Sequence, residues 1–139
     1  MASFVYNSAL ENAAKGLIDF DSDTFKMLLV TSSYSANKDT HEYRDDVTNE
    51  VANGNGYTTG GATTACTVAL DTATDRVTIT FAATNWTTST ITAAAAVVYK
   101  SRGGASSADE LVFYNDFGGN VSSSNATFSV GSTAIVYQN

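Results

Sequence analysis

The sequence predicts an all-β protein, an antiparallel β-sandwich or jelly roll with one short N-terminal helix. Beyond residue 18, apolar residues either alternate with polar ones or form short unbroken runs, and both patterns are typical of strands. The chain has no proline, and glycine-rich doublets such as Gly103-Gly104 and Gly118-Gly119 are expected to supply the turns. Several short strands at fairly even spacing indicate a sandwich or a barrel. A length of 139 residues fits one domain, residues 1–139.

The N-terminal segment, residues 1–18, is predicted to be an arm followed by a short helix. Ser8 and Glu11 have the spacing of a capping box, in which both side chains accept hydrogen bonds from free backbone N–H groups. Apolar residues then recur at helical spacing: Leu10, Ala13, Ala14 and Leu17. Gly16 is expected to end the helix. Because so short a helix is marginal alone, its apolar stripe is expected to pack on the sheet or on a neighbouring subunit.

Strand-length segments follow along the rest of the chain. Residues 25–30 read as a buried strand. Residues 63–70 and 76–81 are expected to form an antiparallel hairpin around the turn 71–75, with alternate apolar residues on one face: Cys66, Val68, Leu70, Val77, Ile79 and Phe81. The other expected strands are 91–99, 111–117, 126–130 and 134–137. Within 91–99 the alanine run 93–96 favours a helix by propensity, but its Thr and Val neighbours favour a strand.

Composition and charge narrow the partners. The net charge is −7 and the pI is about 4.3, so the surface repels nucleic-acid phosphates and anionic lipid heads. No apolar run approaches the roughly 18 to 20 residues of a membrane span. Nucleic acid and membranes are therefore not expected partners. One cysteine, Cys66, and one histidine, His41, leave few options for a disulfide framework, a thiolate metal site or acid–base catalysis.

The long segment 34–61 is rich in charge and is expected to be an acidic loop, with a turn of helix near residues 45–51. A nucleophilic site would have to use His41 with a nearby hydroxyl such as Ser32, Ser33 or Ser35, yet no motif supports it. Asp19, Asp21 and Asp23 begin like a calcium loop, but Thr24 and Val30 stand where that loop needs Gly and Glu. We therefore expect no catalytic residue, metal or cofactor.

Two stretches resemble a group of small structural proteins of tailed bacteriophages. The first is LIDFDSDTFKMLLVTSSYSANKDTHEYRDDVTNEV, residues 17–51, and the second is AAAAVVYKSRGGASSADELVFYNDFGG, residues 93–119. The better-understood proteins of this kind are capsid cement or decoration proteins with a jelly-roll or related sandwich fold. The resemblance implies a virion protein made in the host cytoplasm that binds the outer surface of the capsid. It implies the major capsid protein as partner, and no enzymatic activity.

The expected protein would stabilise the shell by binding alone, as a homo-oligomer, dimer or trimer. The N-terminal aromatic segment and the helix are the candidate partner interface: Phe4, Val5, Tyr6, Leu10 and Leu17. Two other classes stay open. A carbohydrate- or receptor-binding module of a phage tail or fibre would use Trp86 and exposed tyrosines as stacking platforms. A small hydrolase would need His41 in a cleft beside a nucleophile.

Overall fold

The structure, a computed structural model, describes residues 2–139. Met1, the first residue of the N-terminal segment 1–18, lies outside the described residues. Strands make up 48% of it and helices 10%, which confirms the predicted all-β class with a short N-terminal helix. The early elements are β1 (Phe4–Val5), α1 (Asn7–Ala14), β2 (Phe25–Val30), η1 (Arg44–Asp46), β3 (Ala62–Thr64) and β4 (Cys66–Asp71). The later ones are β5 (Arg76–Phe81), β6 (Thr84–Ser89), β7 (Thr92–Lys100), η2 (Ser106–Ala108), β8 (Leu111–Ser122), β9 (Ala126–Val130) and β10 (Thr133–Gln138).

A five-stranded antiparallel sheet forms one layer of the body, in the order β1-β8-β7-β2-β3. Its central strands β2 and β7 are apolar along nearly their whole length, as expected of strands covered on both faces. The alanine run 93–96 lies in β7 and is confirmed as strand, with Ala96 opposite Leu29 and Ala95 opposite Val30. The small side chains of β7 complement the large ones of β2, so this part of the sheet is fully buried.

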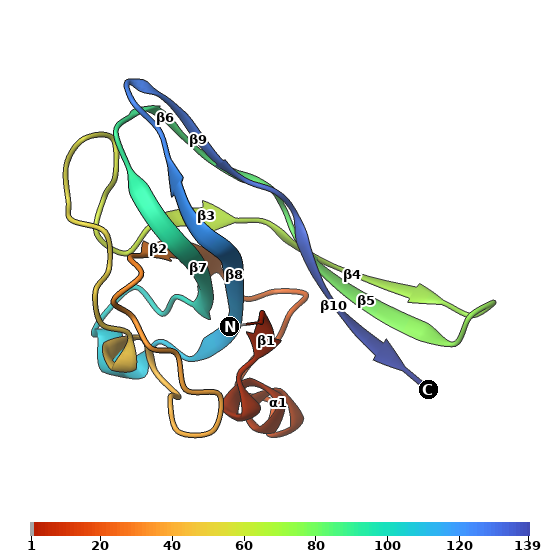
Figure 1. Cartoon of the computed structure of the whole chain (residues 1–139). Helices are drawn as coiled ribbons and strands as arrows, with labels where there is room; N and C mark the ends of the chain where they lie inside the picture. Colours follow the sequence, from red (N-terminus) through yellow and green to blue (C-terminus); the bar gives the residue numbers. More distant parts are fainter. Residues whose placement is uncertain (1) are drawn as a thin grey trace.

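A long antiparallel ribbon forms the second layer and continues beyond the body. In the body β6 pairs with β9, and Trp86 lies opposite Phe128. Further along, β5 pairs with β10, and Phe81 lies opposite Thr133 in the same register. Together with β4 these strands form a three-stranded sheet that projects away from the body and ends near the C-terminus (Figure 1). We call β4, β5 and β10 the arm.

Hydrogen bonds fix the base of the arm at the point where the predicted strand 63–70 is divided into β3 and β4. Residues 63–70 are expected to form one strand, but the chain leaves β3 at Ala65 and changes sheet. Thr64 Oγ1 donates to the Ala82 carbonyl at 2.9 Å, and the Ala82 N–H donates to the Ala65 carbonyl at 2.8 Å. These bonds join the arm to the body at the point where both chains cross between sheets. The predicted hairpin itself is confirmed as β4 and β5.

The acidic loop 34–61 is tied to the body by buried polar contacts. The Tyr57 hydroxyl donates to Glu50 Oε1 at 2.7 Å and accepts from the Leu29 N–H at 3.0 Å. Arg44 Nε lies 2.9 Å from the carboxylate of Asp109, whose side chain is 2% exposed. The helical turn expected at 45–51 is wrong, since the loop has only the short η1 at Arg44–Asp46.

The doublet Gly118-Gly119 is not a turn, contrary to the prediction. It lies inside β8, where the register shifts between Ala93 opposite Val121 and Ala95 opposite Asp116. Gly118 has a φ of +78°, which is easy only for glycine. The doublet therefore lies in a bulge. The extra residues of β8 are accommodated there, and β8 continues to pair with β7 on both sides of it.

Candidate protein-binding groove

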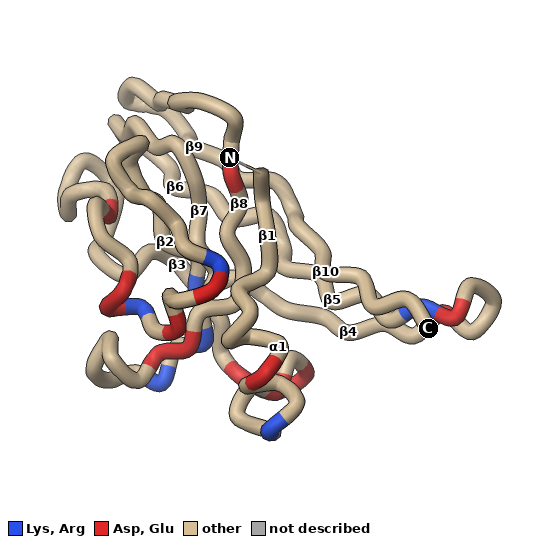
Figure 2. The backbone as a smooth tube through the Cα atoms, turned by 60° about the horizontal axis from the view of Figure 1, so that its bottom comes forward, with Lys and Arg blue, Asp and Glu red and all other residues tan. Residues whose placement is uncertain are grey.

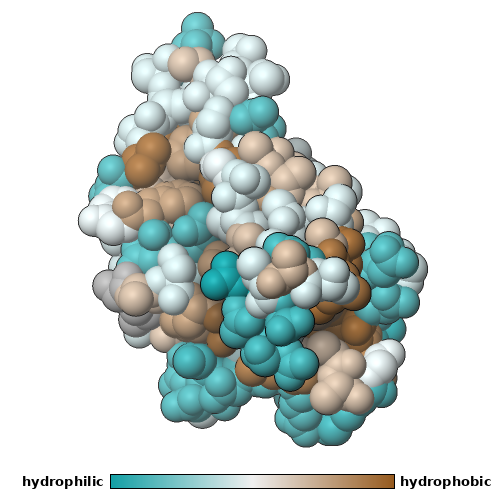
Figure 3. All heavy atoms as spheres, turned by 90° about the vertical axis from the view of Figure 1, so that its right-hand side faces the viewer, coloured by the Kyte–Doolittle hydropathy of each residue, from teal (hydrophilic) through white to brown (hydrophobic). Residues whose placement is uncertain are grey.

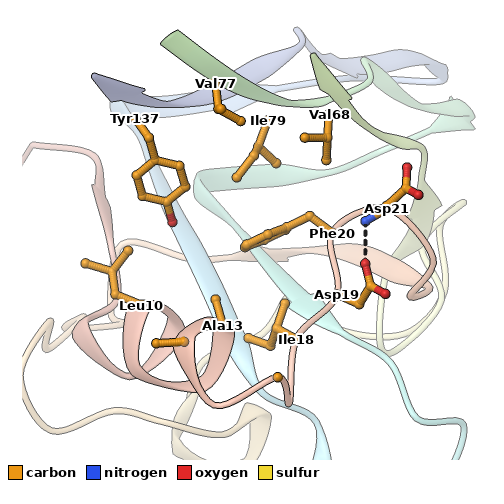
Figure 4. A pocket seen from close by; sticks show the side chains of 12 residues that line it. Leu10, Ala13, Ile18, Asp19, Phe20, Asp21, Val68, Val77, Ile79 and Tyr137 are labelled. Carbon is orange, nitrogen blue, oxygen red and sulfur yellow. Dashed lines mark hydrogen bonds between the residues drawn. The ribbon is translucent and has the colours of Figure 1, made fainter. Parts of the chain in front are cut away.

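A groove with a volume of 810 Å³ lies between α1 and the face of the arm that turns toward it. We call it the arm groove. Figure 4 shows side chains from the two elements pointing toward each other across it. The helix and the turn after it contribute Leu10, Ala13, Ala14, Gly16, Ile18 and Phe20. The arm contributes Val68, Val77, Ile79 and Tyr137. Two carboxylates, Asp19 and Asp21, complete the lining.

The inner face of the arm has apolar side chains in every cross-strand row, with Thr133 as a polar member of the row nearest the body, but only the rows near the body are covered. Ile79 and Ile135 lie opposite each other and are 2% and 6% exposed. Their neighbour Val68 is 43% exposed, and at the tip Leu70 is 70% and Tyr137 is 40% exposed. In Figure 3, which faces the side from which the arm projects, hydrophobic surface lies beside the hydrophilic tip. The arm thus presents to solvent a face built like a core.

The two leucines of α1 and of the turn after it are exposed. Leu10 and Leu17 are 43% and 45% exposed, whereas the buried helix residues are Ala9 and Asn12. The two leucines therefore do not pack on the chain's own sheet, and the other expected possibility, packing on a neighbouring subunit, stays a prediction. The capping box is wrong, because Tyr6 is the N-cap and the Ser8 hydroxyl donates to the His41 carbonyl at 3.2 Å. The helix itself and its stop at Gly16, with a φ of +77°, are as expected.

Phe20 forms the floor of the groove and is itself held by the core. Its ring stacks on Phe25 with centroids 5.7 Å apart and meets Phe81 edge-on at 6.4 Å. Phe25 and Phe81 also contact each other at 5.5 Å. Aromatic contacts of this kind hold the rings in fixed relative positions. The groove is therefore backed by a rigid aromatic cluster where the arm joins the body.

The charges at the groove are negative. The Ser22 hydroxyl and the Asp21 N–H donate to Asp19, and these bonds lower the pKa of the Asp19 carboxyl below its usual value. Asp19 is therefore ionised at neutral pH. Figure 2 shows charged residues gathered in the loops near α1 and at the tip of the arm, while the strands of the arm between these places lack charge.

The five predicted interface residues divide into two groups. Phe4 and Val5 form β1 and pair with β8, so the chain's own sheet holds them. Tyr6 is fully buried, and its hydroxyl lies 3.0 Å from that of Tyr34. Leu10 is the member that lines the arm groove, and Leu17 is exposed close by. The intersubunit contact stays a prediction, but deletion of residues 1–10 would remove part of the core and cannot test binding alone.

His41 takes part in a structural hydrogen-bond chain. Its Nδ1 accepts from the Asn37 N–H at 3.3 Å and lies 2.9 Å from the Tyr34 hydroxyl. Burial raises the pKa of both Tyr34 and Tyr6, so these hydroxyls stay protonated. Among the described residues, no hydrogen bond joins the His41 imidazole to a serine hydroxyl, and Ser8 donates only to the backbone carbonyl of His41. These hydrogen bonds fasten the loop 34–61 to the N-terminal segment.

The alternating aspartates form a turn. The Asp19 N–H donates to Asp23 Oδ2 at 2.8 Å, and Asp23 also pairs with Lys100 at 2.8 Å. Within residues 2–139, no group of three or more His, Cys, Asp or Glu side chains could hold a metal ion. Asp19 and Asp23 act here as acceptors for backbone and hydroxyl donors, which is the ordinary role of Asp in turns.

Trp86 and most tyrosines belong to the core. Trp86 is 5% exposed and packs between Tyr57 and Phe128, with centroids 6.0 and 6.2 Å away. The large exposed aromatic ring is Tyr137, at the groove. A stacking platform built on Trp86, which the carbohydrate-binding alternative requires, is therefore not present at the surface.

Cys66 provides a test of the environment at the base of the arm. Burial, together with the nearby Asp21 carboxylate, raises the pKa of its thiol to about 11. Since the thiolate is the reactive form, we expect iodoacetamide at pH 7.5 to alkylate the folded protein at least about 100-fold more slowly than an exposed thiol with a pKa near 8.5. Mass spectrometry of the folded and urea-unfolded protein measures both rates. Equal rates would contradict this environment.

No family model, curated protein or solved structure matches the chain. In the part of the chain that the structure describes, no helix is long and apolar enough to cross a membrane. Sequence patterns alone identified Leu10, as a candidate interface residue, and the alternating apolar face of residues 66–81, which they placed inside the fold. The apolar face of the hairpin is longer than one short helix can cover. That length is the sequence signal that would have indicated an exposed apolar surface.

Proposed function

We propose that this protein is a structural component of a tailed-bacteriophage virion, a decoration or cement protein that binds the outside of the head through the arm groove. The observation that supports it most is the uncovered apolar face of the arm on an otherwise polar β-body. Of the seven large hydrophobic side chains that are exposed among residues 2–139, five lie on the inner face of the arm or in the helix and the turn after it: Leu10, Leu17, Val68, Leu70 and Tyr137. Exposed apolar surface gathered in one place is typical of a protein-binding site.

The resemblance of residues 17–51 and 93–119 to small phage structural proteins gives this binding surface a context. A shell offers many identical sites, so a protein that binds only the assembled lattice stabilises it by mass action. If it acts as a homo-oligomer, several weak contacts to one rigid array add their effects. On this proposal the partner is the major capsid protein, and the protein performs no chemistry.

The arm suits such contacts because it is rigid where it leaves the body. The ribbon β6–β9 continues into β5–β10 in one register, and the aromatic cluster at its base holds the angle. A pre-ordered binding element loses little conformational entropy on association. The projecting sheet could therefore reach a neighbouring subunit without a disorder-to-order transition.

A reconstruction of virions whose genome encodes this chain would test the proposal most directly. We expect density for the β-body on the outer surface of the head, with the arm groove against a major capsid subunit. Absence of the chain from the particle, or a position in which the groove faces only solvent, would overturn the proposal. A position on the neck or tail would keep the structural role and reject the capsid.

Substitution of the groove tests the same proposal in solution. We expect the double variant Leu10→Ser and Val68→Ser to bind heads assembled without the protein at least about tenfold more weakly, because each side chain loses apolar area that the partner would bury. Co-sedimentation with such heads measures the affinity. Val136→Ser is the matched control, since Val136 is 51% exposed on the opposite face of the arm. Equal binding by the double variant and the control would contradict the role of the groove.

A further inference from the structure

We propose that the arm groove recognises a short, extended segment of another protein in which apolar side chains are flanked by lysine or arginine. This inference rests on the proposed function, because it assigns that segment to the shell protein the groove binds. Three properties of the groove support it: its size, its apolar walls and the sign of its charge.

The size of the groove fits a few side chains. Its volume of 810 Å³ lies within the range of about 300–1,000 Å³ found for sites that enclose a drug-sized ligand. Its walls are a strand face on one side and α1 on the other, so apolar side chains inserted between them would contact both walls (Figure 4). A segment of three to five residues is therefore a better match than a broad flat surface.

The charge of the groove calls for a cationic partner. Asp19 and Asp21 line it, and no Lys or Arg is among the lining residues. Three described cations near the helix and the turn after it are paired with other carboxylates, Lys15 with Glu11, Lys100 with Asp23, and Arg102 with Glu110, and Lys100 adds a weaker attraction to Asp19. The two aspartates thus leave negative charge beside apolar walls. A basic side chain next to an apolar one would complement both.

The same charges argue against a second copy as the occupant. The tip of the arm has two carboxylates, Asp71 and Asp75, and the cation there, Arg76, is hydrogen bonded to Gln138. An arm inserted into the groove of another copy would bring these acids toward Asp19 and Asp21. Each copy also has a net charge of −7. Like charges at this contact would weaken self-association.

The test uses two blocked pentapeptides: lysine-leucine-valine-leucine-lysine, and the same peptide with glutamate in place of both lysines. NMR titration of the full-length protein measures both affinities and locates the shifted resonances. We expect the cationic peptide to bind about threefold to fivefold more tightly, with shifts at Leu10, Val68 and Tyr137. Equal affinities, no binding by either peptide, or shifts elsewhere would overturn the inference.

Asp21→Asn and Asp75→Asn form a matched pair for this test. Each removes one negative charge, and no described hydrogen bond uses the Asp21 carboxylate. Asp75 lies at the tip of the arm with a φ of +55°, a conformation that Asn also adopts. We expect Asp21→Asn to reduce the preference for the cationic peptide and Asp75→Asn to leave it unchanged. If the two variants prefer the cationic peptide to the same degree, the charge of Asp21 does not contribute to recognition in the groove.

Two further measurements separate this inference from the proposed function. Wild-type protein that binds heads but does not prefer the cationic peptide would overturn the inference and leave the function. Protein that prefers the cationic peptide but does not bind heads would overturn the proposed function and leave the preference of the groove for such a segment. Sedimentation equilibrium of the wild type and the Leu10→Ser and Val68→Ser variant would detect a second copy in the groove, and a dimer that the substitutions dissociate would also overturn the inference.

Discussion

Replacing Gly61 with alanine is expected to destabilise the fold by more than about 3 kcal/mol. Gly61 has a φ of +76°, where an L-residue costs about 1–2 kcal/mol. A Cβ there would also overlap the carbonyl of Met27 and lie 2.7 Å from Leu28 Cα. Overpacking against backbone that cannot move adds roughly 1–3 kcal/mol. Urea denaturation followed by circular dichroism gives the free energy of unfolding.

Gly103→Ala is the control that separates the two causes. Gly103 has a φ of +77°, nearly the same as Gly61, but no heavy atom lies within 4 Å of the position its Cβ would take. We expect this variant to lose only the cost of the left-handed conformation, about 1–2 kcal/mol. If both variants lose the same free energy, the close approach of the 60–61 turn to β2 does not restrict position 61.

Phe81→Ala is expected to cost about 3–5 kcal/mol, as is usual when a buried phenylalanine is removed. Phe81 is fully buried, and its ring lies 5.5 Å from Phe25 at the junction of arm and body. The substitution would leave a cavity there and remove support from Phe20 under the groove. The measurement is the shift in the urea midpoint.

The comparison variant is Leu70→Ala on the same face of the arm. Leu70 is 70% exposed at the tip, so its truncation should change the free energy of unfolding by no more than about 0.5 kcal/mol. A large loss at Leu70 and a small one at Phe81 would mean that the arm is anchored through its tip, contrary to this structure.

Sequence patterns located the elements that show clear alternation or a short unbroken apolar run. Residues 25–30 and 126–130 are strands with the predicted bounds, and the hairpin has its predicted apolar face. The strand β6 was missed because its buried residues, Thr84, Trp86 and Ser89, do not alternate regularly. A register shift between Trp86 and Ser89, with a φ of +48° at Thr88, breaks the period of two. Bulges of this kind depend on the partner strand, which a local pattern does not contain.

The candidate site was predictable in its residues but not in its arrangement. Leu10 and Leu17 have the spacing of a buried helix face, yet the helix buries Ala9 and Asn12 instead. The sheet that would cover the leucines turns away as the arm, and Tyr6, directly before the helix, is fully buried in the core. Periodicity identifies an apolar face, but burial depends on whether another element reaches it.

By itself, the order of residues determined that this chain forms antiparallel strands, where most of them lie, which side chains share a face, and that its surface is acidic. Those properties depend on neighbours a few positions apart, where alternation, turn residues and net charge act directly. Only the tertiary structure decided that β3 and β4 separate into different sheets, that the ribbon continues past the body as an arm, and that an apolar face is left open opposite α1. These features arise from contacts between residues far apart in the chain, because long-range packing determines which apolar surfaces are covered and which remain available to a partner.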